Sequence, residues 1–196
     1  MMLSMRMDQQ GLLTDKFNQA LPYAEFLAGA DLAHRPPWEQ RYGQCELNPQ
    51  QSELIAGFTR KIHVLCLTGT WCGDCALQGA AMQRIAEANP DMIDLRFLLR
   101  DEEHADLIVK TPVNAGFRVP FTWWLAEDFA PVACFGDRSL SRYRSMARKA
   151  LGEQATVVAP PPEDPVLAVR DEIVEEFERV HLILRLSARL REKHQD

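Results

Sequence analysis

The sequence predicts an α/β domain in which a central mixed β-sheet is flanked by helices, with helical segments added before and after it. Three observations support this prediction. Short apolar runs at 61–67 and 92–99 enclose a helical segment, which is typical of a parallel β-α-β unit. Two further strands, at 120–128 and 131–137, are joined by a tight turn. An amphipathic helix at 139–151 closes the unit.

Length and composition exclude several classes of protein. A chain of 196 residues is long enough for one well-packed domain with extensions and short for two. Its net charge of -6 argues against a nucleic-acid partner, because nucleic-acid binders carry a basic face. No apolar stretch approaches the roughly 18–20 residues that span a bilayer, so no membrane partner is expected.

Cysteine usage and the N-terminus both point to the cytoplasm. The first residues lack the apolar core of a signal peptide. Five cysteines, an odd number, fit free thiols in a reducing compartment better than a framework of structural disulfides. We therefore expect a cytoplasmic location.

The start of the chain is expected to be a helical N-terminal extension over 1–47. Its helical apolar spacing is interrupted at Pro22. Asn48 and Pro49 suit the N-cap and the first position of the next helix. The main domain is therefore predicted to occupy 48–151.

The core of the domain alternates strand and helix. The run KIHVLCL at 61–67 is short and rich in β-branched residues, as a buried strand requires. A helix over 73–89 follows and ends at an Asn-Pro pair. The run MIDLRFLL at 92–99 is the second strand, and a short helix at 101–109 comes after it.

The rest of the chain, 152–196, is predicted to be a proline linker and a long C-terminal helix over 165–192. Apolar residues recur along this helix at steps of three and four, at Val166, Val169, Ile173, Phe177, Val180 and Leu184. We expect this stripe to pack on the domain. A homodimer through the C-terminal helix is the alternative, because Leu182, Ile183 and Leu186 widen the stripe.

The stretch TGTWCGDC at 68–75 carries the candidate chemistry. Cys72 is expected at the N-cap of the helix and Cys75 one turn inside, a spacing that lets the two sulfurs form a disulfide. Unpaired N–H groups and the positive end of the helix dipole stabilise a thiolate at Cys72. A thiolate with a lowered pKa both attacks disulfides and leaves readily. Cys75 would resolve the mixed disulfide.

Asp74 is expected to tune this pair. Its carboxylate repels a thiolate in the same helical turn and should limit the fall in the pKa of Cys72, so we predict a reductant rather than a strong oxidant. No metal is expected, because structural zinc sites commonly use two close pairs of ligands and the chain has one CxxC. An inert cysteine pair is the remaining alternative.

These features together resemble the thioredoxin superfamily: WCGDC after a strand, the β-α-β unit, and GFRVPF leading into a hairpin. The chain is most similar to a bacterial thioredoxin-like subgroup that carries a helical N-terminal extension, a WCGD motif and a strand close to RFLLRDE. The resemblance covers 48–151 well and implies a thioredoxin-like fold.

The resemblance also implies which residues bind the substrate. Trp71 stands where the family has an aromatic residue before the nucleophile. Val119 and Pro120 stand at its docking residue and cis-proline, where the backbone is free to pair with an extended substrate. The family's buried acid, six residues before the nucleophile, is replaced by Cys66, so a usual general base is missing. Asp74 is the candidate to replace it.

The predicted function is that of an enzyme, a cytoplasmic thiol–disulfide oxidoreductase. Cys72 would attack the disulfide of a protein or a small molecule, and Cys75 would release the product. No bound cofactor is expected, because the electrons reside in the thiols; a separate reductase or a small thiol must reduce the pair again.

Two alternatives remain open. The first is a thioredoxin-fold binding or adaptor module with vestigial redox activity, which the missing acid and the added helices favour. An open Cys72 would support the enzyme, and a Cys72 covered by 1–47 would support the adaptor. The second is a thiol peroxidase that uses Thr68 and Arg118 beside the sulfur.

Other polar residues are weighed by their place in the predicted elements. Arg100 and Asp101 follow the second strand, at the sheet edge where open α/β sheets place their sites. Arg100 is a candidate to steady a thiolate or a substrate carboxylate; the alternative is a solvated Arg100 beside a helix-capping Asp101. His63 is expected in the core, and His104 is expected to be exposed.

Overall fold

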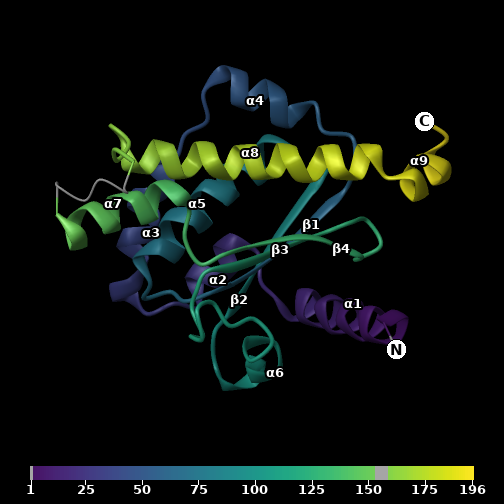
Figure 1. Cartoon of the computed structure of the whole chain (residues 1–196), viewed down its shortest axis with the longest axis horizontal. Helices are drawn as coiled ribbons and strands as arrows, with labels where there is room; N and C mark the ends of the chain where they lie inside the picture. The colour runs from purple at the N-terminus through teal and green to yellow at the C-terminus, as the bar shows by residue number, and fades with distance from the viewer. Residues whose placement is uncertain (1, 153–158) are drawn as a thin grey trace.

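The computed structural model describes residues 2–152 and 159–196, and it confirms the predicted α/β fold (Figure 1). One mixed sheet has the strand order β2-β1-β3-β4. Strands β1 and β2 are parallel, whereas β3 runs antiparallel to β1 and β4 antiparallel to β3. Their bounds are β1 (Ile62–Thr68), β2 (Ile93–Leu99), β3 (Phe121–Leu125) and β4 (Pro131–Gly136).

Helices of the described residues surround this sheet. In chain order they are α1 (Met2–Gln19), α2 (Tyr23–Ala28), the 3-10 helix η1 (Leu32–His34), α3 (Arg35–Gln44), α4 (Pro49–Ala56), α5 (Gly73–Ala88), the 3-10 helix η2 (Glu102–His104), α6 (Ala105–Ile108), α7 (Leu140–Leu151), α8 (Pro165–Leu186) and α9 (Ala188–His194). The predicted cap of α4 is confirmed, because Asn48 and Gln51 form a capping box. Among these helices, none is both long and apolar enough to cross a membrane.

The sheet separates two cores, and side chains alternate between them. Cys66 of β1 and Trp124 of β3 lie in the core beneath α5 and α8. Leu67 and Trp123, their sequence neighbours, lie in the core covered by α1. Strand β1 is thus buried on both faces, which explains why it is a continuous apolar run rather than an alternating one.

The predicted C-terminal helix is two helices, not one. Helix α8 ends at Leu186, Ser187 adopts an extended conformation, and α9 follows. Helix α8 lies along α5 and α7 (Figure 1), and most of its apolar stripe is buried in the core. Leu182 and Ile183 remain exposed, and the homodimer stays a prediction. Residues 153–158 of the predicted linker lie outside the described residues.

Helix α3 attaches the N-terminal segment to α5 through Trp38. The Trp38 side chain is fully buried, and its ring meets Phe97 edge-on with the ring centroids 6.0 Å apart. Its Nε1–H group donates a hydrogen bond to the carbonyl of Thr70 at 2.9 Å. Gly79 of α5 makes room for the ring, since a Cβ at this position would lie 2.4 Å from it. Phe26, Trp38 and Cys45 of the N-terminal segment therefore share a core with the sheet, and the domain boundary at 47 stays a prediction.

The close approach of Trp38 to Gly79 gives the first testable prediction. Alanine is a better helix former than glycine, yet Gly79→Ala should lower the free energy of unfolding by roughly 1–3 kcal/mol because the indole must move. The matched control is Gly43→Ala on α3, where a Cβ meets nothing within 4 Å and the gain should be up to about 1 kcal/mol. Urea unfolding of both variants checks this; a stabilising Gly79→Ala would contradict the packing described.

Candidate functional site

The two cysteines of WCGDC lie between the end of β1 and the first turn of α5. Cys72 is the N-cap of α5, as predicted, and its Sγ accepts a hydrogen bond from the backbone N–H of Cys75 at 3.4 Å. Both cysteines are free thiols; Cys75 is fully buried, whereas Cys72 is half-buried. The structure thus places an accessible sulfur directly in front of a buried one.

The position of the two thiols at the start of α5 shifts their pKa values in opposite directions. The pKa of Cys72 falls to about 6, chiefly because the Cys75 thiol donates a hydrogen bond to its sulfur. Burial opposes this fall, the backbone N–H groups of Cys75 and Asp74 add to it, and the Asp74 charge opposes it. The pKa of Cys75 is raised well above its usual value, first by burial and then by the same hydrogen bond. Near neutral pH, Cys72 is therefore the thiolate and Cys75 the protonated partner.

The predicted docking segment lies against the reactive sulfur. The Val119–Pro120 peptide bond is cis, as the resemblance implies, and the Val119 carbonyl oxygen lies 3.7 Å from Sγ of Cys72. Trp71 is 50% exposed, and its ring covers Gly69, where a Cβ would lie 2.7 Å from the ring. Backbone groups and an aromatic surface therefore border Cys72, although their roles in binding stay predictions.

The site is open on the side of α5. Cys72 lies between two exposed residues, Trp71 and Gly73, and a Cβ added at Gly73 would meet nothing within 4 Å. The N-terminal segment reaches the motif at Thr70, where His34 Nδ1 lies 3.1 Å from the Thr70 hydroxyl. The N-terminal segment thus hydrogen-bonds to the motif at Thr70, two residues before Cys72.

Asp74 is held by two arginines that the sequence did not connect with it. Nε of Arg138 and Nε of Arg142 each donate to one oxygen of this buried carboxylate, at 2.6 Å. A carboxylate bound on both oxygens is engaged as an ion pair, so the structure does not support Asp74 as a free base for Cys75. Arg142 lies in the first turn of α7, whereas Arg138 precedes the N-cap Ser139, so no helical spacing in the sequence connected the two arginines with Asp74.

Cys66, which replaces the buried acid of the family, lies in the core. Cys66 is buried, as predicted, and burial raises the pKa of its thiol to about 12. Among the buried polar groups near Cys66 is the Thr68 hydroxyl, which lowers the pKa of Cys75 against the effect of burial. Arg118, considered for a peroxidase, pairs with Asp137 with the two groups 3.5 Å apart.

A hollow of about 350 Å³ lies beside Trp71, on the side of the N-terminal segment. The N-terminal segment contributes Leu21, Phe26 and His34 to its walls, and Phe97 of β2 forms part of its floor. Most of the lining is apolar. The N-terminal helices therefore shape the surface next to the motif as well as packing on the sheet.

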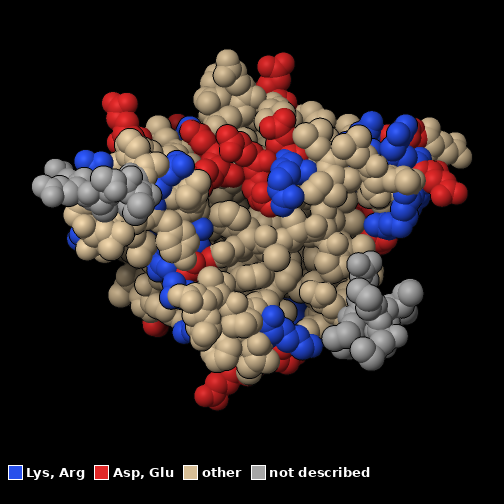
Figure 2. Space-filling view, in the orientation of Figure 1, with Lys and Arg blue, Asp and Glu red and all other residues tan. Residues whose placement is uncertain are grey.

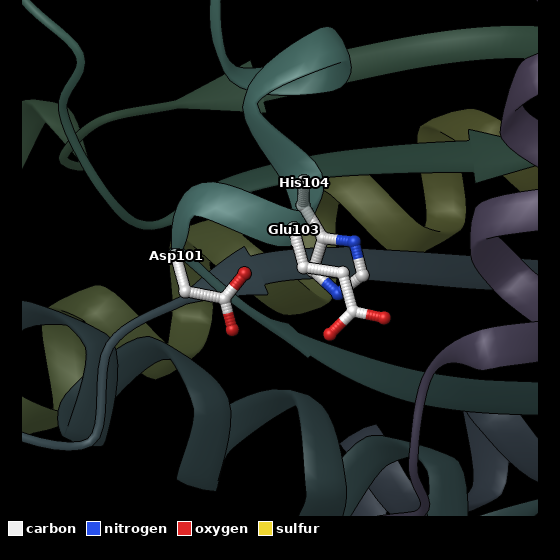
Figure 3. A group of neighbouring side chains, drawn as sticks. All are labelled: Asp101, Glu103 and His104. Carbon is white, nitrogen blue, oxygen red and sulfur yellow. The ribbon is translucent and has the colours of Figure 1, made fainter.

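Asp101, Glu103 and His104 gather on the turn after β2, with ligand atoms within 4.8 Å of one another (Figure 3). His104 is buried, contrary to the sequence expectation, because α1 covers it. The Lys16 ammonium of α1 lies 3.3 Å from His104 Nδ1 and forms an ion pair with Asp106 at 2.8 Å. This lysine supplies the positive charge that the acidic turn faces, so we assign the group to the docking of α1 rather than to a metal.

Comparison with known proteins agrees with the fold. A thioredoxin family model matches residues 20–150. Among solved structures, a protein of unknown function from Pseudomonas aeruginosa has a TM-score of 0.65 at 16% identity, with 88% of this chain and 96% of that chain covered. An HIV epitope scaffold has a TM-score of 0.64 at 16% identity, with coverages of 89% and 98%. At such identity these likenesses show the fold alone.

No curated protein matches the chain. The family match nevertheless extends over more than half of its length and includes both cysteines, Val119 and Pro120, and all of α7 except its last residue. The predicted thioredoxin-like fold is therefore confirmed, and the chain belongs to the thioredoxin family.

Proposed function

We propose that the protein is a thiol–disulfide oxidoreductase that acts as a reductant through Cys72 and Cys75. The observation that carries this proposal is the asymmetry of the pair. Cys72 is half-buried with a pKa of about 6, and Cys75 is fully buried, protonated and hydrogen-bonded to it. An exposed thiolate is what attack on a disulfide requires, and a shielded neighbouring thiol is what resolution requires.

The exchange proceeds in two steps. The Cys72 thiolate attacks one sulfur of the substrate disulfide, forms a mixed disulfide and releases the other sulfur as a thiolate, which takes up a proton. Cys75 then loses its proton and attacks Sγ of Cys72, and the second substrate sulfur leaves and is protonated. The substrate gains two electrons and two protons, and the protein retains a Cys72–Cys75 disulfide. A separate reductase or a small thiol returns the electrons, without a bound cofactor.

Trp71, Val119 and Pro120 are the proposed docking residues for a protein or small-molecule disulfide. The Val119 carbonyl beside the sulfur supports this assignment, because it lies where an extended substrate would pair with the backbone. The open flank of Cys72 favours an enzyme over an adaptor. Free thiols at all five cysteines fit a reducing compartment, and we propose the cytoplasm.

A redox titration tests the proposal directly. In glutathione buffers, alkylation and mass measurement should show one two-electron transition confined to Cys72 and Cys75, at a potential between roughly −290 and −180 mV. Cys75→Ser should then accumulate a mixed disulfide through Cys72. The proposal fails if the pair never forms a reversible disulfide, or if alkylation of the pair releases zinc.

The pH dependence of alkylation tests the asymmetry of the pair. Because the thiolate is the reactive form, the rate at which iodoacetamide modifies Cys72 should rise with pH and reach half its maximum near pH 6. Cys75→Ala removes the principal hydrogen-bond donor, so the midpoint should move up toward the ordinary value of about 8.5. Equal midpoints in the two proteins would show that the Cys75 thiol does not stabilise the thiolate.

Asp74→Asn tests the role of the charged residue between the cysteines. Removal of the carboxylate charge should lower the midpoint for Cys72 below that of the unchanged protein, because this charge raises the pKa. Asp91→Asn, an exposed change beyond the other end of α5, is the matched control and should leave the midpoint where it is. A higher midpoint in Asp74→Asn would contradict the electrostatic argument.

A further inference from the structure

A groove continues the site beyond the docking segment. It has a volume of about 250 Å³ and is lined by Arg100, Phe117, Arg118, Val119, Asp137 and Arg138. Val119 belongs both to this groove and to the redox site, since its carbonyl oxygen lies 3.7 Å from Sγ of Cys72. A substrate whose disulfide lies at Cys72 therefore brings its flanking groups to the groove.

The three arginines of the groove are held in place. Arg100 donates from Nη1 to the carbonyl of Phe117 at 2.6 Å, and its guanidinium lies 6.0 Å from the centre of the Trp71 ring. Asp137 binds Arg138 at 2.5 Å and Arg118 at 3.5 Å. Donors that are already oriented lose little freedom when they bind an acceptor, which favours recognition of a carboxylate.

One of these donors has no acceptor in the described part of the chain. Nε of Arg100 is buried and without a hydrogen-bond partner among the described residues. Buried donors are nearly always paired, so this one calls for an acceptor that the described residues do not supply, such as a water molecule or a group of the substrate. Carboxylate oxygens are the acceptors that a guanidinium binds best, often through two parallel hydrogen bonds.

The charge of the groove is opposite to that of the chain. Three guanidiniums line it against the fully buried carboxylate of Asp137, and Asp74 also pairs with Arg138, so the local charge stays positive, whereas the whole chain has a net charge of -6. Figure 2 shows acidic side chains gathered over α4 and α8, and Lys and Arg side chains around α7, which follows the groove in the chain. An acidic substrate is thus repelled from much of the surface and attracted to this region.

We propose that this arginine groove, lined by Arg100, Arg118 and Arg138, binds carboxylates that flank the disulfide of the substrate. The protein would then prefer disulfides in acidic peptide segments. This inference rests on the proposed function and adds a class of substrate to it. The side chains of basic segments offer no acceptor for the guanidiniums and are repelled by them.

Three peptides that each contain one disulfide, identical except for Glu, Gln or Lys beside the cysteines, provide the test. The protein, reduced beforehand, would be mixed with each peptide and the rate of a single turnover measured. The Glu peptide should be reduced roughly tenfold faster than the Lys peptide at low salt, and the gap should narrow as the salt concentration rises. Equal rates for all three peptides would overturn the proposal.

Variants of the groove arginines test whether the preference for acidic peptides arises from the groove. The double change Arg100→Gln with Arg118→Gln should bring the ratio of the Glu and Lys rates close to one. Lysine at both positions should restore part of it, since charge is retained without the guanidinium geometry. The matched control is Arg144→Gln with Lys149→Gln, both on α7 and outside the groove, which also removes two positive charges and should keep the full ratio. An equal loss of preference in this control would show a general charge effect and contradict the assignment to the groove.

A binding measurement separates this inference from the proposed function. A protein with Cys72→Ala and Cys75→Ala cannot exchange disulfides, yet it should bind the Glu peptide more tightly than the Lys peptide in fluorescence anisotropy. If the unchanged protein reduces no peptide, the proposed oxidoreductase function is refuted. The binding preference of the double-alanine variant still shows whether the groove recognises carboxylates. If a variant fails to fold, the salt dependence of the Glu-to-Lys rate ratio in the unchanged protein still tests whether the groove prefers acidic peptides.

Discussion

The burial of Trp38 against Gly79 is the contact on which the rest of this structure depends. The indole fills the space that a side chain on α5 would occupy, meets Phe97 of β2 and donates its N–H to the carbonyl of Thr70. One side chain from the N-terminal segment therefore connects the sheet, the helix and the loop that carries the cysteines. The added helices are part of the structure that presents the motif.

From that loop, the chemistry follows from helix geometry and burial. Cys72 is the N-cap residue, where backbone N–H groups point at its sulfur, and Cys75 is buried in the core one turn later. The ion pairs around Asp74 and Asp137 connect this helix start with the segment before α7. Arg138 binds both carboxylates, so the first turn of α5 and the arginine groove belong to one charged network.

Local signals predicted most elements of the fold. The strand predicted at 61–67 is observed at 62–68, and the cap at Asn48 is present. The break between α8 and α9 was missed because Ser187 lies in an otherwise helical pattern, without a glycine or proline to mark it. His104 was predicted to be exposed, but α1, nearly ninety residues away in the chain, buries it.

The sequence by itself determined the parts of the site that are local: a CxxC at the start of a helix after a buried strand, and the Val-Pro pair before the hairpin. Hydrophobic periodicity and capping act within a few residues, so they can be recognised in the chain alone. Only the tertiary structure decided which charges meet. Asp74 lies 64 residues from Arg138 in the chain, and such pairs depend on how α5, β4 and α7 pack rather than on any local pattern.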